Sequence, residues 1–132
     1  MKKIAVIGAG TMGNGIAHVF AQKGFQVHLL DSQKEALDKA IVTIGKNLDR
    51  QINKGTITAE EKIDTLQRIA NFTSIELGVI EADLIIEAAT ENSEIKKSIF
   101  KQMDHAAKPD CILATNTSSI SIAQLAAVTG RP

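Results

Sequence analysis

A glycine-rich turn near the amino terminus has the spacing with which proteins bind a diphosphate. Three glycines have G-x-G-x-x-G spacing: Gly8, Gly10 and Gly13. The first glycine of such a turn permits a sharp bend, the second lets a pyrophosphate approach the backbone, and the third lets the next helix pack closely on the strand. A helix opening at Thr11 and Met12 would place its first N–H groups at the positive end of its dipole. These residues are therefore predicted to bind the phosphates of a dinucleotide.

An acidic residue stands where a dinucleotide site needs one. Asp31 ends a second predicted strand and lies eighteen residues beyond Gly13. A carboxylate at this position accepts hydrogen bonds from the adenosine ribose hydroxyls and repels a 2′-phosphate, so the sequence favours NAD over NADP. The alternative is a tight strand-to-helix turn without a ligand, with Asp31 as a surface residue.

A cluster of hydrogen-bonding side chains, residues 115–119, follows the last predicted strand. In doubly wound sheets ligands bind outside the carboxyl ends of the strands, so this cluster is a candidate site. Part of it has another explanation, because Ser121 and Gln124 have the spacing of a helix capping box. That explanation leaves Asn116 and Ser118 without a structural role, and a functional one is therefore predicted for them.

The elements that must position these residues form an alternating pattern. Short, largely apolar runs predict four parallel strands, near residues 3–8, 26–31, 84–89 and 111–115, and residues 71–73 are predicted as a further short strand between the second and fourth. The pattern predicts an α/β fold with a doubly wound parallel sheet, a Rossmann-like dinucleotide-binding domain. Glu87 interrupts the fourth strand and would be costly to bury without a hydrogen bond. A helix follows from about residue 93, with three residues predicted on its inward face: Ile95, Ile99 and Met103.

A helical hairpin is predicted between the second and third strands, at about residues 33–69. Its first helix has an apolar stripe: Leu37, Ile41, Ile44, Leu48 and Ile52. Its second helix begins with a capping box, Thr58 to Glu61, and carries Ile63, Leu66 and Ile69. Four cations form a second stripe on the first helix: Lys39, Lys46, Arg50 and Lys54. They could bind phosphates or form a solvated face interspersed with acidic residues.

Composition excludes several classes of protein. The 132 residues suit one domain, and the 15 Lys and Arg balance the 15 Asp and Glu, which argues against a nucleic-acid or membrane-surface protein. No apolar stretch is long enough to span a membrane, and the amino terminus has no signal-peptide core. The single cysteine, Cys111, fits a cytoplasmic protein. No metal site is predicted, because His18, His28 and His105 are scattered.

The chain resembles the amino-terminal half of the 3-hydroxyacyl-CoA dehydrogenases. The resemblance spans the whole chain and is carried by residues 6–17, 87–92 and 116–119. It implies NAD as the cofactor, with Asp31 on the adenosine ribose. It also implies that Glu91 and Lys96 line the nicotinamide-ribose side, that Asn116 lies beside the cofactor, and that Ser118 hydrogen-bonds the reacting C3 oxygen.

The resemblance also gives the hairpin a function. It matches the family's coenzyme A-binding arm, so Lys54, and less directly Asn47, are implied to hold the adenosine-phosphate end of a 3-hydroxyacyl-CoA substrate. The implied reaction is reversible oxidation of a (3S)-3-hydroxyacyl-CoA to a 3-oxoacyl-CoA. The family's base is a histidine oriented by a glutamate, shortly beyond the serine cluster. Residues 119–132 contain neither residue type.

The sequence is therefore interpreted as an NAD-binding domain truncated at its carboxyl end, without the helical domain that carries dimer contacts in the family. The chain is expected to bind NADH and to turn over substrate negligibly, while the full-length protein would be a homodimer. Two alternatives remain. One is another NAD-dependent hydroxyacid dehydrogenase, and the other is a non-catalytic NAD-sensing module.

Overall fold

The apolar run at residues 4–7 forms the centre of a five-stranded sheet in which all neighbouring strands are parallel. The computed structural model describes residues 3–88 and 93–115 of the chain. Its elements are β1 Lys3–Ile7, α1 Thr11–Gln22, β2 Gln26–Leu30, α2 Lys34–Asn53, α3 Ala59–Gln67, β3 Ile69–Phe72, α4 Ile75–Val79, β4 Leu84–Glu87, α5 Ser93–Ala106 and β5 Ile112–Thr115. The alternation of strands and helices is that of a doubly wound α/β fold.

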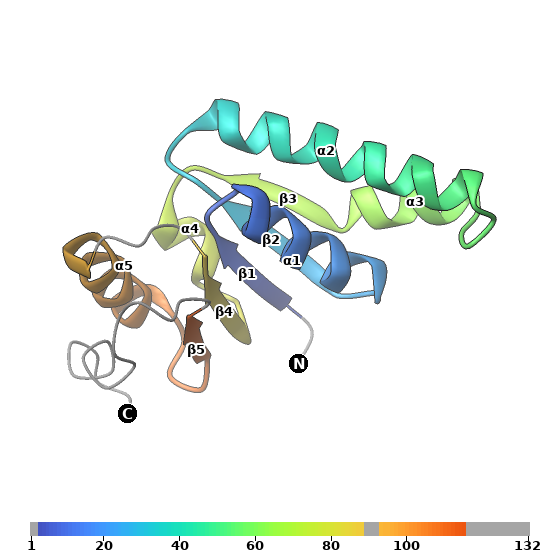
Figure 1. Cartoon of the computed structure of the whole chain (residues 1–132). Coiled ribbons are helices and arrows are strands. Elements are labelled where there is room, and N and C mark those ends of the chain that lie inside the picture. The colour runs from blue at the N-terminus through green and yellow to red at the C-terminus, as the bar shows by residue number, and fades with distance from the viewer. Residues whose placement is uncertain (1–2, 89–92, 116–132) are drawn as a thin grey trace.

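The order of the strands places a ligand site at one edge of the sheet. The order is β3-β2-β1-β4-β5, so the chain builds outward from β1 first in one direction and then in the other. The carboxyl ends of β1 and β4 lie side by side at this reversal, where doubly wound sheets bind their ligands. The predicted fold class, with a helical pair after the second strand, is confirmed (Figure 1).

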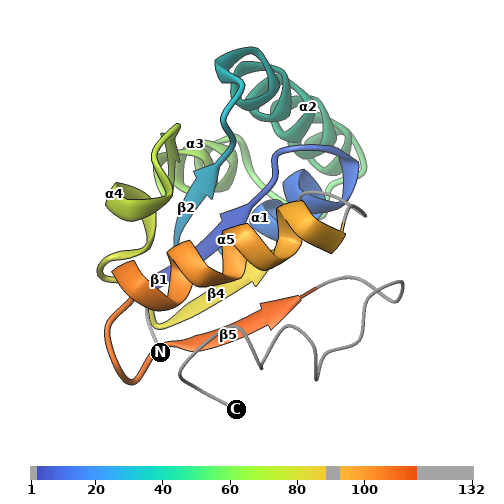
Figure 2. The same cartoon turned by 90° about the vertical axis from the view of Figure 1, so that its left-hand side faces the viewer.

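Each face of the sheet has its own hydrophobic core, because successive side chains of a strand point to opposite faces. Ile4 and Val6 of β1 pack in one core with α1, α2 and α3. Ala5 and Ile7 pack in the other, with α4 and α5. Figure 2 views the sheet with α4 and α5 in front and the hairpin behind it. Burial on both faces explains why β1 is apolar from Ile4 to Ile7.

The helical hairpin forms as its sequence predicts. Leu37, Ile44 and Leu48 of α2 are fully buried, and the basic stripe on α2 is exposed to solvent. The capping box at the start of α3 is present. The Glu61 amide donates to Thr58 Oγ1, and the Thr58 amide donates to Glu61 Oε1, each over 3.1 Å. Among the described residues no helix combines the length and apolar character needed to cross a membrane.

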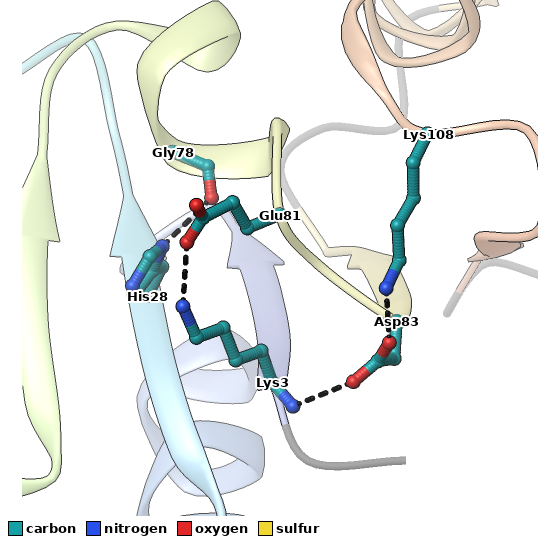
Figure 3. A network of polar contacts seen from close by, with 6 residues as sticks. All are labelled: Lys3, His28, Gly78, Glu81, Asp83 and Lys108. Atoms are coloured by element: carbon teal, nitrogen blue, oxygen red, sulfur yellow. Dashed lines mark hydrogen bonds and ion pairs between the residues drawn. The ribbon is translucent and has the colours of Figure 1, made fainter.

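A network of polar contacts closes the amino edge of the sheet (Figure 3). Asp83 accepts from the Lys3 amide through Oδ2 (3.0 Å) and from Lys108 Nζ through Oδ1 (2.5 Å). Lys3 Nζ forms a second ion pair with Glu81 (2.5 Å). The hydrogen bond from Lys3 lowers the pKa of Glu81, and the hydrogen bond to Asp83 raises the pKa of Lys108. The network joins residues that are up to 105 positions apart, because the amino ends of parallel strands meet at one edge.

Some element boundaries differ from the sequence prediction. The hairpin ends at Gln67, and Ile69 lies in β3 beside Val27, so its assignment to the second helix was wrong. Pairing with β2 provides backbone hydrogen bonds that the helical pattern did not reveal. Helix α4 was not predicted. It has five residues and is capped by Ser74, whose Oγ accepts from the Leu77 amide (3.4 Å), so it is too short to show a periodic pattern.

Several apolar residues of the helical patterns are exposed. Met12 and Val19 are 58% and 53% exposed, whereas the buried positions of α1 include Gly13, Ala17 and Ala21. Small residues face the sheet because α1 lies very close to it. The prediction that Ile95 faces inward was wrong, since it is 51% exposed, while Met103 on the same helix is fully buried.

Candidate functional site

The glycine-rich turn has the geometry that its spacing predicts. Gly8 has φ +104°, a conformation that residues with a side chain rarely adopt, and its amide donates to the Leu30 carbonyl at 2.7 Å. A Cβ on Gly13 would lie 1.6 Å from the Gly8 carbonyl oxygen. Only glycine therefore lets α1 begin this close to the turn.

The amino end of α1 lies at the carboxyl edge of the sheet. Gly10 is the N-cap residue and has no side chain with which to cap the helix. Among the described residues, no atom lies within 4 Å of a Cβ built on Gly10, so none of them blocks the approach of a ligand to this backbone. Thr11 and Met12 form the first turn and are exposed. A helix end of this kind favours a bound diphosphate.

Asp31 lies at the end of β2 and is tied to the glycine-rich turn. The Ala9 amide donates to its Oδ2 (3.0 Å), and the Gln33 amide donates to its Oδ1 (2.9 Å). The sequence predicted a carboxylate that would bind a ribose. The structure shows in addition that this carboxylate holds the turn against β2. The contact with Ala9 spans 22 positions, and no local sequence signal indicates it.

A cavity of about 620 Å³ opens beside Asp31 at the carboxyl edge of the sheet. Its lining comes from the ends of β1 and β2, the start of α4, and α5: Ile7, Gly8, Leu30, Asp31, Ser32, Thr73, Ser74, Ile75, Glu76, Ile95, Ile99 and Gln102. Isoleucine and leucine side chains line it together with hydroxyl and carboxylate groups. This mixture suits a flat heterocycle joined to a ribose, so the cavity fits the adenosine half of a dinucleotide.

Sequence reasoning missed the part of this cavity that follows β3. Thr73 and Ser74 come directly after a strand whose carboxyl end reaches the same edge as β1 and β2. That position was the available signal, because ligands lie outside strand ends in such sheets. The third strand was too weakly patterned for the signal to be used.

The histidines and Glu87 have structural surroundings. His18 Nε2 contacts Gln22 Oε1 (2.8 Å), His28 Nδ1 donates to the Gly78 carbonyl (2.9 Å), and His105 is exposed on α5. No group of three potential metal ligands exists within the described ranges. Glu87 is fully buried at the end of β4, and every buried side-chain nitrogen or oxygen of the described residues has a hydrogen-bond partner.

The residues assigned to coenzyme A lie far from the cofactor turn. Asn47 is half-buried on α2, and its Oδ1 accepts from Arg50 Nη1 (3.2 Å). Lys54 is exposed and caps the carboxyl end of α2. At 1.5 Å per residue, the twenty residues of α2 carry Lys54 about 30 Å from the end that follows Asp31. Only a long ligand could contact both regions.

Three of the predicted site residues lie outside the described residues: Glu91, Asn116 and Ser118. Lys96 belongs to α5, and its side chain is not described. The structure therefore brings together the glycine turn and Asp31, and the roles of these four residues stay predictions.

Comparisons with known proteins agree with this geometry. Residues 3–132 match the family model of the 3-hydroxyacyl-CoA dehydrogenase NAD-binding domain. The chain is 46% identical over its whole length to a 3-hydroxybutyryl-CoA dehydrogenase of Bradyrhizobium diazoefficiens, covering 45% of that protein. It is also 46% identical to a 3-hydroxyadipyl-CoA dehydrogenase of Escherichia coli, covering 28% of that protein.

A solved structure supports the same relationship. The crystal structure of (S)-3-hydroxybutyryl-CoA dehydrogenase from Ralstonia eutropha superposes with a TM-score of 0.95 and is 44% identical. The match covers 99% of this chain and 46% of that chain. The chain thus spans about half the length of this relative and of the Bradyrhizobium protein. These matches, with which the glycine-rich turn and the cavity beside Asp31 agree, show that the chain belongs to the 3-hydroxyacyl-CoA dehydrogenase family, as its NAD-binding domain.

Proposed function

We propose that this chain is the cofactor-binding part of an enzyme that reversibly oxidises (3S)-3-hydroxybutyryl-CoA to the 3-oxoacyl-CoA. The observation that carries the proposal is the glycine-rich turn at the amino end of α1, which lies beside the Asp31 cavity. Relatives named for 3-hydroxybutyryl-CoA at 44–46% identity support the four-carbon acyl group. We place the protein in the cytoplasm, which agrees with its single cysteine, Cys111, being buried and in no disulfide.

The described residues would hold the cofactor along the carboxyl edge. The backbone at Gly10, Thr11 and Met12 faces the diphosphate, and the Asp31 carboxylate accepts from the adenosine ribose while it holds the turn. When bound, the nicotinamide accepts the hydride that leaves C3 of the substrate. In the proposal, Glu91 and Lys96 line its ribose side and Asn116 lies beside the cofactor, as the family resemblance implies.

Ser118 would hydrogen-bond the C3 oxygen, and a separate base would remove the hydroxyl proton. A neutral serine hydroxyl is a poor base near pH 7, so Ser118 orients the oxygen and does not take its proton. His18 and His28 are engaged away from the carboxyl edge, and His105 lies on the solvent side of α5. We therefore assign the base to sequence beyond residue 132, together with the contacts of a homodimer.

The hairpin would bind the coenzyme A end of the substrate. Lys54, at the carboxyl cap of α2, supplies an exposed cation for a phosphate, and Asn47 supplies an amide about two turns earlier on the helix. Their distance from the glycine turn matches an extended carrier that brings its thioester toward the cofactor.

Binding and turnover measurements test the proposal. The 132-residue chain is expected to bind NADH and coenzyme A, as measured by fluorescence and calorimetry, with negligible NADH production from 3-hydroxybutyryl-CoA. A version extended through the segment that relatives carry after this domain is expected to restore turnover, since loss of a positioned base costs about 10²–10⁴ in rate. Including 3-hydroxyadipyl-CoA as a second substrate tests the acyl group. Turnover by the short chain within tenfold of the long one would contradict the assignment of the base.

A further inference from the structure

A chain of side-chain hydrogen bonds links the dinucleotide helix to the hairpin. His18 Nε2 lies 2.8 Å from Gln22 Oε1, and Gln22 Nε2 donates to Gln51 Oε1 over 2.8 Å. We call these three residues the glutamine bridge. Because the Gln22 amide oxygen only accepts, His18 must donate to it, and His18 is 8% exposed. The bridge connects α1 to α2 through Gln22 and Gln51, which are 29 positions apart in the sequence.

Gln51 also fixes the turn that presents Lys54. Its backbone carbonyl accepts from both the amide and the hydroxyl of Thr56, each over 3.0 Å. The turn from Lys54 to Thr56, with Gly55 at φ +77°, is thereby closed onto Gln51. The side chain of Gln51 thus holds α1 while its backbone holds the hairpin tip.

Gln51 lies on α2 between the residues proposed to bind coenzyme A. Asn47, Gln51 and Lys54 are spaced i, i+4 and i+7, so they lie along one stripe of the helix surface. A second contact secures the other end of the hairpin, since Arg68 Nη1 donates to the Ala21 carbonyl at the end of α1 (2.8 Å).

We propose that Gln22 and Gln51 are positioning residues for the coenzyme A end of the substrate. They fix the Asn47–Lys54 stripe relative to α1, whose other end binds the cofactor diphosphate. They thereby set the distance between the coenzyme A site on the hairpin and the cofactor site at the glycine-rich turn. The inference rests on the proposed function, because it needs the hairpin to bind coenzyme A. Neither glutamine touches the substrate or the cofactor in this proposal.

The test uses variants that keep length and helix propensity but remove the hydrogen bond: Gln22→Met, Gln51→Met and the double variant. Calorimetry with coenzyme A is expected to show about 3–10-fold weaker binding for each single variant, the range expected for losing one hydrogen bond. The double variant should bind no more weakly than the singles, because each removes the same link. NADH affinity should change less than twofold in all three variants. The control variant Gln67→Met, at an exposed glutamine on α3, should change neither coenzyme A affinity nor NADH affinity.

Hydrogen exchange supplies a readout that does not depend on ligand binding. Amides of residues 50–56 are expected to exchange faster in Gln22→Met and Gln51→Met than in the wild-type chain. Gln51→Glu keeps an oxygen acceptor for Gln22 Nε2, so it should restore slow exchange at these amides.

The outcomes separate the two proposals. Coenzyme A binding that is weakened by Lys54→Ala but unchanged by the bridge variants would overturn the positioning role alone. Unaltered exchange at residues 50–56 in both bridge variants would overturn it as well. If coenzyme A fails to bind the wild-type chain, or binds Lys54→Ala unchanged, the hairpin's assignment in the proposed function is overturned, and this inference with it.

Discussion

The two edges of the sheet are built in opposite ways from the same five strands. At the amino edge, Asp83 bonds Lys3 and Lys108, and Glu81 pairs with the Lys3 ammonium (Figure 3). At the carboxyl edge, no described residue lies within 4 Å of a Cβ built on Gly10, and a cavity of about 620 Å³ lies beside Asp31. One edge satisfies its polar groups internally, and the other leaves room for a ligand. The comparison predicts that variants at the amino edge change stability, whereas variants at the carboxyl edge change cofactor binding.

The largest effect is expected at Gly13. In Gly13→Ala the new Cβ would meet the Gly8 carbonyl at 1.6 Å, so α1 must move away from the turn. We expect NADH affinity to fall by about a hundredfold or more, because small displacements of binding groups have effects of this size. The free energy of unfolding should fall by about 1–3 kcal/mol, as overpacking typically costs.

The matched control is Gly10→Ala. Its Cβ would have no neighbour within 4 Å in the described part of the chain, so the free energy of unfolding in urea should change by less than about 0.5 kcal/mol while NADH affinity still falls. Normal NADH binding by Gly10→Ala would show that no pyrophosphate approaches at this position.

An intermediate effect is expected at Asp31. The wild-type chain should bind NADH at least about tenfold more tightly than NADPH, because a carboxylate near a 2′-phosphate is repelled by several kcal/mol before screening. Asp31→Asn removes the charge but keeps an acceptor for the Ala9 amide, so it should narrow this ratio and keep most of the NADH affinity. Asp31→Ala loses both, and NADH affinity should fall as well. Fluorescence titration measures each ratio, and equal wild-type affinities would contradict the prediction.

A smaller effect, confined to stability, is expected at Asp83. Asp83→Ala leaves the Lys3 amide without its side-chain acceptor, which should cost about 1–3 kcal/mol in urea unfolding. NADH affinity of the folded protein should change less than twofold, since the cavity lies at the opposite edge. Asp38→Ala, at an exposed carboxylate on α2, is the control. A large loss of NADH affinity in Asp83→Ala would mean that the two edges are not independent.

The smallest effect is expected on how stability at the amino edge depends on pH. The pKa of Lys108 is raised above its ordinary value of 10.5, so its contribution to stability is full below that pH and is lost as the pH rises through the raised value. The pKa of Glu81 is lowered below 4.5, so its contribution is present above that pH and is lost as the pH falls through the lowered value. The Lys3–Glu81 pair is exposed and the Lys108–Asp83 pair is partly exposed, so salt should weaken both effects, that of the Lys3–Glu81 pair more strongly.

Urea midpoints of the wild-type chain and Lys108→Met, compared from neutral pH to above 10.5, check the first of these effects. The difference between the two proteins should shrink at high pH. A difference that stays constant with pH would exclude a role for the lysine charge.

Local chemistry in the sequence was enough to predict the sheet, the turn and the hairpin. Gly8 is required by its backbone conformation, and Gly13 is required by its close packing on the Gly8 carbonyl. The two glycines lie within six residues of each other. The capping box at Thr58 depends on residues three positions apart. The strands follow from short apolar runs. Each of these features depends on neighbours along the chain, so each leaves a readable pattern.

Only the tertiary structure decided which distant residues meet. The Ala9–Asp31 contact, the Gln22–Gln51 bridge and the Lys3–Asp83 contact join positions 22, 29 and 80 residues apart. Ile69 was assigned to a helix because its local pattern fits one, and pairing with β2 placed it in a strand instead. Such contacts depend on strand order and on how closely helices pack on the sheet. No periodicity within a single segment encodes them, since the segment of one partner carries no signal that identifies the other.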